Sequence, residues 1–145
     1  MARILLLHWG RTAAGPALTL KLAREMIADG RHEVFLSYSA QADIVEEFRA
    51  VSCSSFEVST WGSVWGVPKA AVELPRTIIG LRRFMRKNRI NVSLVPMEQP
   101  MQSLAAWAFG AHGARQILFM HDASLHLGER SPIIALLRRF HIAPA

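Results

Sequence analysis

The side chains best suited to chemistry follow an apolar run, 116–120, late in the chain. His121 and Asp122 come directly after this run, and the same loop continues to His126 and Glu129. Open α/β sheets bind ligands where their strands end, at the carboxyl edge. A neutral imidazole can hydrogen-bond a hydroxyl while a neighbouring carboxylate fixes its tautomer. We therefore expect function at this edge, with His121 and Asp122 as the candidate catalytic pair.

The same two residues also fit a purely structural interpretation. Adjacent residues leaving a strand point to opposite sides, so His121 equally fits a hydrogen-bonded core histidine and Asp122 a turn residue. His121 and His126 lie five residues apart with no Cys nearby and no H-E-x-x-H spacing, which does not favour metal binding. The residues predict neither a metal site nor another cofactor.

Patterns typical of strands and helices alternate along the chain. Apolar or alternating runs predict strands, and apolar stripes at helical spacing predict helices. The strands are expected at 4–9, 33–38, 56–61, 92–97 and 116–120, and the helices at 17–29, 41–51, 74–87, 101–109 and from 131 onward. Such alternation predicts a mainly parallel sheet of about five strands in a Rossmann-like three-layer sandwich. The first run is expected to be the central strand, and 145 residues suffice for one such domain.

The loop after the first expected strand is the second candidate binding element. It contains Gly10, Arg11, Thr12 and Gly15 ahead of an expected helix, whose N-terminus would attract an anion. The loop does not spell G-x-G-x-x-G and lacks the Lys of a P-loop, so a dinucleotide or ATP site is not supported. Glycines that only turn the chain explain the pattern as well as ligand contact does.

The charge balance favours anionic partners without choosing among them. The formal net charge is +6, and the densest basic run contains Arg82, Arg83, Arg86 and Lys87. These cations near the end of an expected helix fit a solvated face, with contact to an anionic membrane surface as the alternative and no nucleic-acid role. The chain shows neither a signal-peptide core nor an apolar run long enough to span a bilayer. Its single cysteine, Cys53, fits a structural residue in a reducing compartment, so a cytoplasmic location is expected.

A resemblance to a known family rests on three segments of the chain. The segments are the opening 3–12 with Gly15-Pro16, the run 33–39, and above all His121-Asp122-Ala123 followed by His126-Leu127-Gly128-Glu129. Together they resemble the N-terminal half of family 4 glycosyltransferases, which are retaining GT-B enzymes with two Rossmann-like domains facing across a cleft. One departure is Leu127, where the family pattern would have proline.

The resemblance implies roles for individual residues. Gly10 and Gly15 match the loop that approaches the diphosphate of a nucleotide sugar and the acceptor. Arg11 and Thr12, in the same loop, are expected to bind substrate. His121 matches the histidine that meets the hydroxyls of the donor sugar. Glu98, at the end of the fourth expected strand, is expected to touch an acceptor hydroxyl, and His126 and Glu129 to line the same rim.

The resemblance also implies that a second domain is missing. The chain is expected to be the acceptor-side domain, 1–145, without the C-terminal donor domain, and to show little turnover alone. The whole enzyme would transfer a hexose from a nucleotide sugar, with retention, to a sugar or lipid acceptor. The rival interpretation is a stand-alone flavodoxin-like α/β domain that binds a ligand without catalysis. A degenerate gene product without function remains a third possibility.

Overall fold

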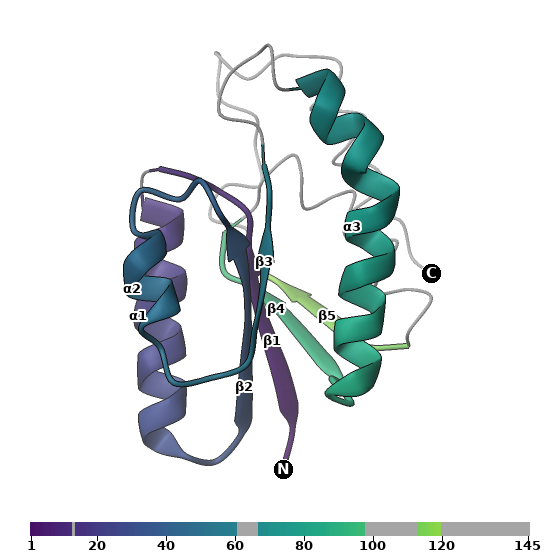
Figure 1. The fold of residues 1–145 in the computed structure, drawn as a ribbon. Coiled ribbons are helices and arrows are strands. Elements are labelled where there is room, and N and C mark those ends of the chain that lie inside the picture. The colour runs from purple at the N-terminus through teal and green to yellow at the C-terminus, as the bar shows by residue number, and fades with distance from the viewer. Residues whose placement is uncertain (13, 61–66, 98–112, 120–145) are drawn as a thin grey trace.

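The computed structural model describes residues 1–12, 14–60, 67–97 and 113–119. Within them the chain alternates between strands and helices (Figure 1). The strands are β1 (Arg3–His8), β2 (Glu33–Ser39), β3 (Ser55–Val58), β4 (Val92–Val95) and β5 (Arg115–Leu118), and the helices are α1 (Ala14–Asp29), α2 (Val45–Arg49) and α3 (Val67–Lys87). The candidate residues Glu98, His121, Asp122, His126 and Glu129 lie outside the described residues, as do the helices expected at 101–109 and from 131.

The five strands form one parallel sheet in the order β3-β2-β1-β4-β5. β1 is central and pairs with β2 from Arg3 opposite Glu33 to His8 opposite Tyr38, and with β4 through Leu5 opposite Ser93. The expected α/β class and the central place of β1 are therefore confirmed. In this order the chain reverses direction across the sheet between β1 and β4, and their carboxyl ends flank the usual ligand crevice of such folds.

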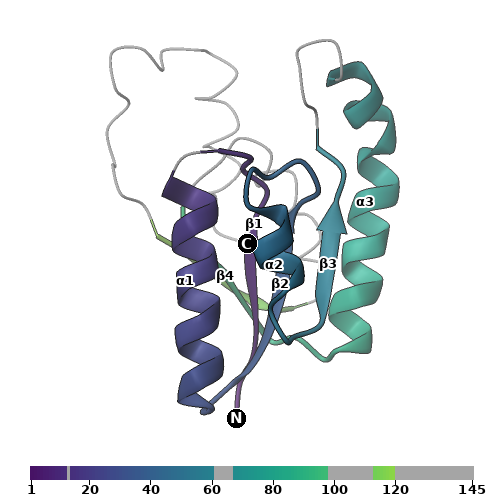
Figure 2. The same ribbon diagram turned by 60° about the vertical axis from the view of Figure 1, so that its left-hand side comes forward.

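Helices cover both faces of the sheet, α1 and α2 on one side and α3 on the other (Figures 1 and 2). β1 explains why, since its side chains are apolar toward both faces: Leu5 and Leu7 join the core cluster under α3, and Leu6 joins the cluster under α1. All three are fully buried. A strand enclosed on both faces has this continuous apolar sequence.

The structure corrects the predicted starts of two helices. α1 begins three residues earlier than expected, at Ala14, and α3 begins seven residues earlier, at Val67. Pro16 and Pro68 led to an interpretation of these positions as loop. Both lie in the first helical turn, where the missing proline N–H leaves no helix hydrogen bond unmade. Gly15 thus belongs to α1 and not to the loop before it.

Helix α2 and two strands are shorter than expected. α2 covers only Val45–Arg49 of the predicted 41–51. The preceding residues turn instead, because Ser39 accepts hydrogen bonds from two following amides: its Oγ from Gln41 at 3.0 Å and its carbonyl from Ala42 at 3.1 Å. Strands β3 and β4 end at Val58 and Val95, ahead of the predicted 61 and 97.

Among the helices that the structure describes, none has the length and apolar character of a membrane span.

Candidate functional site

The carboxyl end of β1 lies beside the first turn of α1. His8 is 2% exposed and follows Leu6 on the α1 side of the sheet, because alternate strand residues share a face. A Cβ placed on Gly15 would stand 2.2 Å from His8 Nε2 and 2.4 Å from Cε1. Only a residue without a side chain leaves room for the imidazole at this position. His8 and Gly15 therefore form one structural unit, which we call the His8–Gly15 contact.

Burial keeps the His8 imidazole neutral. Removal from water lowers its pKa from 6.5 to about 4, and a backbone hydrogen bond with Met97, just past β4, offsets part of that shift. Nδ1 has no hydrogen-bond partner within the described part of the chain. At neutral pH the ring has one N–H, which the Met97 backbone engages, and one lone pair, which is left on Nδ1. A neutral imidazole thus stands between the ends of β1 and β4, at the ligand crevice expected for this strand order.

The start of α1 adds a positive helix end to this place. Its first four residues are Ala14, Gly15, Pro16 and Ala17, with no acidic residue among them. Backbone N–H groups at a helix start have no partner inside the helix and attract anions. α1 runs opposite to β1, so this end faces the carboxyl edge of the sheet (Figure 1). The arrangement suits the negatively charged part of a ligand.

The neighbouring strand ends are occupied by a closed polar network. Ser39 at the end of β2 bonds to Thr60 after β3 through their hydroxyls at 2.5 Å, and the Gln41 side-chain carbonyl accepts from the Thr60 amide at 2.6 Å. All three side chains satisfy one another, which is typical of a structural clamp between two loops. The network holds the β2 and β3 loops. At the described carboxyl ends of the strands it leaves His8 as the buried side chain with an unpaired polar atom.

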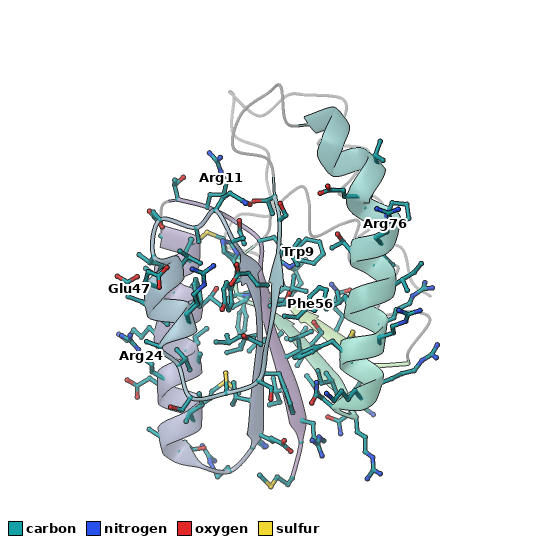
Figure 3. The ribbon with its side chains drawn as sticks, in the orientation of Figure 1. Trp9, Arg11, Arg24, Glu47, Phe56 and Arg76 are labelled. Carbon is teal, nitrogen blue, oxygen red and sulfur yellow. The ribbon has the colours of Figure 1, made fainter. Side chains whose placement is uncertain are left out.

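Trp9 anchors the first loop on the opposite face. Its ring is 1% exposed and belongs to the cluster under α3, between sheet and helix (Figure 3). Its Nε1–H donates to Ser37 Oγ at 2.9 Å, and both groups are buried. His8 and Trp9 thus point to opposite faces from successive positions. The chain leaves β1 in a direction that both side chains fix.

We expect Trp9→Phe to lower the free energy of unfolding by about 2 kcal/mol. The change removes one buried hydrogen bond and leaves the Ser37 hydroxyl without its partner. Urea unfolding followed by circular dichroism measures it. In a Ser37→Ala background the same change should cost at least about 1 kcal/mol less, because no hydroxyl is left unpaired. An equal cost in both backgrounds would show that the hydrogen bond contributes nothing.

The structure brings some of the predicted site residues together. Gly10 and Gly15 are both buried, one after β1 and one in the first turn of α1. Arg11 is half-buried, and its carbonyl accepts from the Asp43 amide at 2.8 Å, so it also ties this loop to the α2 side (Figure 3). Thr12 is exposed. Whether any of these residues contacts a substrate stays a prediction, as it does for the five candidates outside the described residues.

The sequence interpretation missed His8. It counted His8 as one more residue of the apolar strand 4–9. A signal was available, since a single histidine ends an otherwise aliphatic strand and a glycine follows at the start of the next helix. Cys53, by contrast, agrees with its expected structural role: it is half-buried and burial raises its pKa to about 11, so the thiol stays protonated. The described residues contain no cluster of three metal-ligating side chains.

Comparison with known proteins shows the fold and no closer relationship. No family model and no curated protein sequence matches the chain. MurG of Acinetobacter baumannii superimposes with a TM-score of 0.67 at 11% identity, covering 95% of this chain and 39% of that protein. The glycosyltransferase VinC, solved with dTDP, gives 0.56 at 12% identity over 94% of this chain and 43% of that protein. The chain thus spans less than half the length of these two proteins.

A similar solved structure of another class is the FMN-dependent UbiX-like decarboxylase of Escherichia coli O157:H7. It gives a TM-score of 0.53 at 14% identity, covering 97% of this chain and 74% of the decarboxylase. At such identities the likeness extends to the fold alone. This chain therefore has the Rossmann-like α/β fold that MurG and the glycosyltransferase VinC also contain.

Proposed function

We propose that this chain is the acceptor-side domain of a GT-B glycosyltransferase, with residues 1–145 forming one Rossmann-like unit. The single observation that carries the proposal is the junction of β1, β4 and α1. There a neutral buried His8, the buried Gly10 and a helix start without acidic residues meet at one edge of the sheet. The coverage of nearly the whole chain by MurG and VinC supports the same choice.

The junction suits a nucleotide sugar for physical reasons. The N-terminal end of α1 stabilises a negatively charged diphosphate. The neutral imidazole of His8 adds an unpaired hydrogen-bond acceptor, Nδ1, without adding a charge at the same junction. In the proposal His121 meets the hydroxyls of the donor sugar, and Asp122 is its loop neighbour in the candidate catalytic pair. Glu98, His126 and Glu129 line the rim, with Glu98 touching an acceptor hydroxyl. The finer assignment of a retaining hexose transfer, as in family 4 enzymes, rests on the sequence resemblance.

Partners and location belong to the same proposal. The donor is a nucleotide sugar, the acceptor is a sugar or a lipid, and a second domain supplies most of the contacts to the departing diphosphate. The proposed location is the cytoplasm, in peripheral contact with the inner membrane face. The single protonated thiol of Cys53 is compatible with a reducing compartment.

NMR titration of the labelled chain tests the binding part of this proposal. We expect nucleotide sugars to shift the amide resonances of Gly10 and Gly15 saturably, while Gly30, at the far end of α1, stays unchanged. Dissociation constants in the millimolar range would fit a half site, because small ligands pay a large entropy cost on binding. Shifts confined to residues away from the β1–β4 junction, or no shift with any nucleotide sugar, would contradict the proposal. Robust sugar transfer by the chain alone would contradict the assignment of the diphosphate contacts to a second domain.

The rival function is a stand-alone domain that binds a ligand such as a flavin. The observation in its favour is the likeness to the UbiX-like decarboxylase, of which the chain spans 74%. Titration with FMN discriminates the two, because a bound flavin changes its fluorescence. Saturable FMN binding at the β1–β4 junction, with no response to nucleotide sugars, would favour this second function.

A further inference from the structure

Strand β5 lies at one edge of the sheet and carries exposed apolar side chains. Ile117 is 48% exposed, and Phe119, directly after the strand, is 52% exposed. Ile117 is the register partner of Leu94, which packs against the core cluster on the α1 side. Both exposed side chains therefore point to that side, because alternate strand residues share a face. α1 packs against β1 and β2, and α2 against β2, so these two helices lie over the other half of the sheet (Figure 2).

The outer edge of β5 offers backbone groups for pairing. The amides of Arg115 and Phe119 each donate, at 3.0 Å, to carbonyl groups of the neighbouring segment 91–95. Successive residues of a strand direct their N–H and C=O groups to opposite sides. Gln116 and Leu118 therefore direct theirs away from β4, where the sheet of the described residues ends. Each of these two residues presents one donor and one acceptor to a further strand.

The opposite edge of the sheet, strand β3, is built differently. Its exposed side chains are Ser55 and Glu57, and Glu57 forms an ion pair with Arg49 at 2.7 Å. Polar and charged side chains of this kind keep edge strands from pairing with other chains. On β5 the exposed side chains are Arg115, at its start, and Ile117. The β5 edge is therefore the one that favours association.

We infer that β5 pairs with β5 of a second copy of this chain, in a two-fold symmetric dimer with one continuous sheet. Two identical strands related by such an axis run antiparallel. Gln116 then lies opposite Leu118 of the partner subunit, and the N–H group of each donates to the C=O group of the other. The inference goes beyond the proposed sugar transfer and does not depend on it.

The residues of this edge select both the register and the partner. Only the register centred on Ile117 places every residue of 115–119 opposite another residue of 115–119. Ile117 then meets Ile117 of the partner subunit at the axis, and Arg115 meets Phe119 of the partner subunit. A pair of aliphatic side chains and a guanidinium beside an aromatic ring are both favourable across strands. The edge is thus complementary to itself, which makes a second copy the occupant that fits it.

The dimer would leave both candidate sites accessible. In the sheet, β4 lies between β5 and the central β1. Because the strands of the two protomers run in opposite directions, their carboxyl edges also face opposite ways. Each protomer therefore keeps its own β1–β4 junction, away from the axis. Pairing of so short an edge buries little surface, so we expect a weak dimer with a dissociation constant in the micromolar range.

Sedimentation velocity of the full chain over a range of concentrations tests this inference. The average mass should rise with concentration from that of the monomer, 16.2 kDa, toward twice that value. Gln116→Pro should raise the dissociation constant at least about tenfold, because it removes an N–H donor that faces the partner in each protomer. Ile117→Lys should also abolish dimers, because two ammonium groups would meet at the axis.

Two matched controls separate the β5 edge from general effects of the substitutions. The carbonyl groups of Ser54 and Val58 bond to β2 and to the residue after it, so the amide of Ser55 points outward at the other edge. Ser55→Pro therefore removes an outward N–H there, and Ile79→Lys adds the same charge on α3 at an isoleucine that is also 48% exposed. Both controls should dimerise as the unmodified chain does. Thermal unfolding by circular dichroism shows that each variant is folded.

Cysteine cross-linking in a Cys53→Ser background reports the register. Opposite residues that share no hydrogen bond have Cα atoms about 4.5 Å apart, within the range of about 4.4 to 6.8 Å found for disulfides. Ile117→Cys should therefore form a covalent dimer when dissolved oxygen oxidises the two thiols. Phe119→Cys should not, because the two thiols would lie roughly 13 Å apart along the strands.

Three results would overturn the inference. These are a chain that stays monomeric at the concentrations used for NMR, equal weakening by Gln116→Pro and Ser55→Pro, and cross-linking of Phe119→Cys as readily as of Ile117→Cys. None of them bears on the binding of nucleotide sugars at the β1–β4 junction, which the monomeric Ile117→Lys variant should retain. Failure of the sugar titration would likewise leave the dimer standing, so the two outcomes remain distinguishable.

Discussion

Gly15→Ala is expected to lower the free energy of unfolding by about 3 kcal/mol. The added methyl group would meet His8 Nε2 at 2.2 Å and Cε1 at 2.4 Å, far inside contact distance. The imidazole has little room to move away, because it is 2% exposed and lies between the sheet and α1. Overpacking of an enclosed site costs typically about 1 to 3 kcal/mol. Chemical denaturation followed by circular dichroism measures the change.

A double-mutant cycle assigns the cost to the His8–Gly15 contact. In a His8→Ala background the space for a methyl group exists, so Gly15→Ala should become neutral or stabilise by up to about 1 kcal/mol, the usual advantage of alanine in a helix. The coupling between the two positions should therefore approach about 3 kcal/mol. If Gly15→Ala costs the same with and without the imidazole, the close approach is not what excludes a side chain at position 15.

Acidification should destabilise the protein through His8 well above the range in which carboxyl groups titrate. The pKa of His8 falls from 6.5 in the unfolded chain to about 4 in the folded one. Between these values the unfolded state binds the extra proton, so stability falls as the pH falls. The full difference corresponds to about 3 kcal/mol, of which about 2 kcal/mol should be lost by pH 5. Urea unfolding at a series of pH values between 7 and 5 measures it.

His8→Gln should remove this dependence, since glutamine does not titrate. His32→Gln is the matched control, because His32 is a half-buried histidine at the amino end of the sheet and accepts a hydrogen bond from the Ala2 amide. It should leave the slope between pH 7 and 5 in place. An unchanged slope in His8→Gln would mean that another group is responsible. Asp29 and Glu57, whose pKa values arginine partners lower, contribute only at still lower pH.

Both experiments address the buried imidazole of His8, which lies at the centre of the candidate site. The desolvated imidazole stays neutral over the whole physiological pH range, because its pKa lies far below it. A ligand that binds at the β1–β4 junction stabilises the folded chain by linkage. We expect thermal unfolding in the presence of a binding nucleotide sugar to shift upward for the unmodified chain and less for His8→Gln.

The layered fold was predictable because it follows from periodicity. The uninterrupted apolar residues of β1 required cover on both faces, and the glycine stop at Gly30, which adopts φ of 68°, ended α1 where expected. The helix starts were not predictable from propensity alone. Pro16 and Pro68 read as loop residues along the sequence, yet each sits in a first turn where a proline costs nothing.

The candidate site was only partly predictable. The sequence singled out Gly10 and Gly15 as parts of a candidate binding loop after the first strand. Both residues do lie at the carboxyl edge of the sheet. Their proposed role was ligand approach, whereas the structure gives Gly15 a second and more definite role against His8. Sequence pattern could not show this, because a contact between a strand end and the following helix depends on how α1 packs across the sheet.

The amino-acid sequence by itself determined the fold class of this protein. Apolar strands that alternate with amphipathic helices fit a parallel sheet covered by helices, and they exclude a fold made of helices alone or of strands alone. Only the tertiary structure decided which side chains meet. Packing of α1 against β1 placed Gly15 on the imidazole of His8, desolvated that ring and lowered its pKa. It also turned Val72 and Ile79 outward on α3 while burying Leu81 and Met85. Such pairings depend on distances between elements, which periodicity along a chain does not encode.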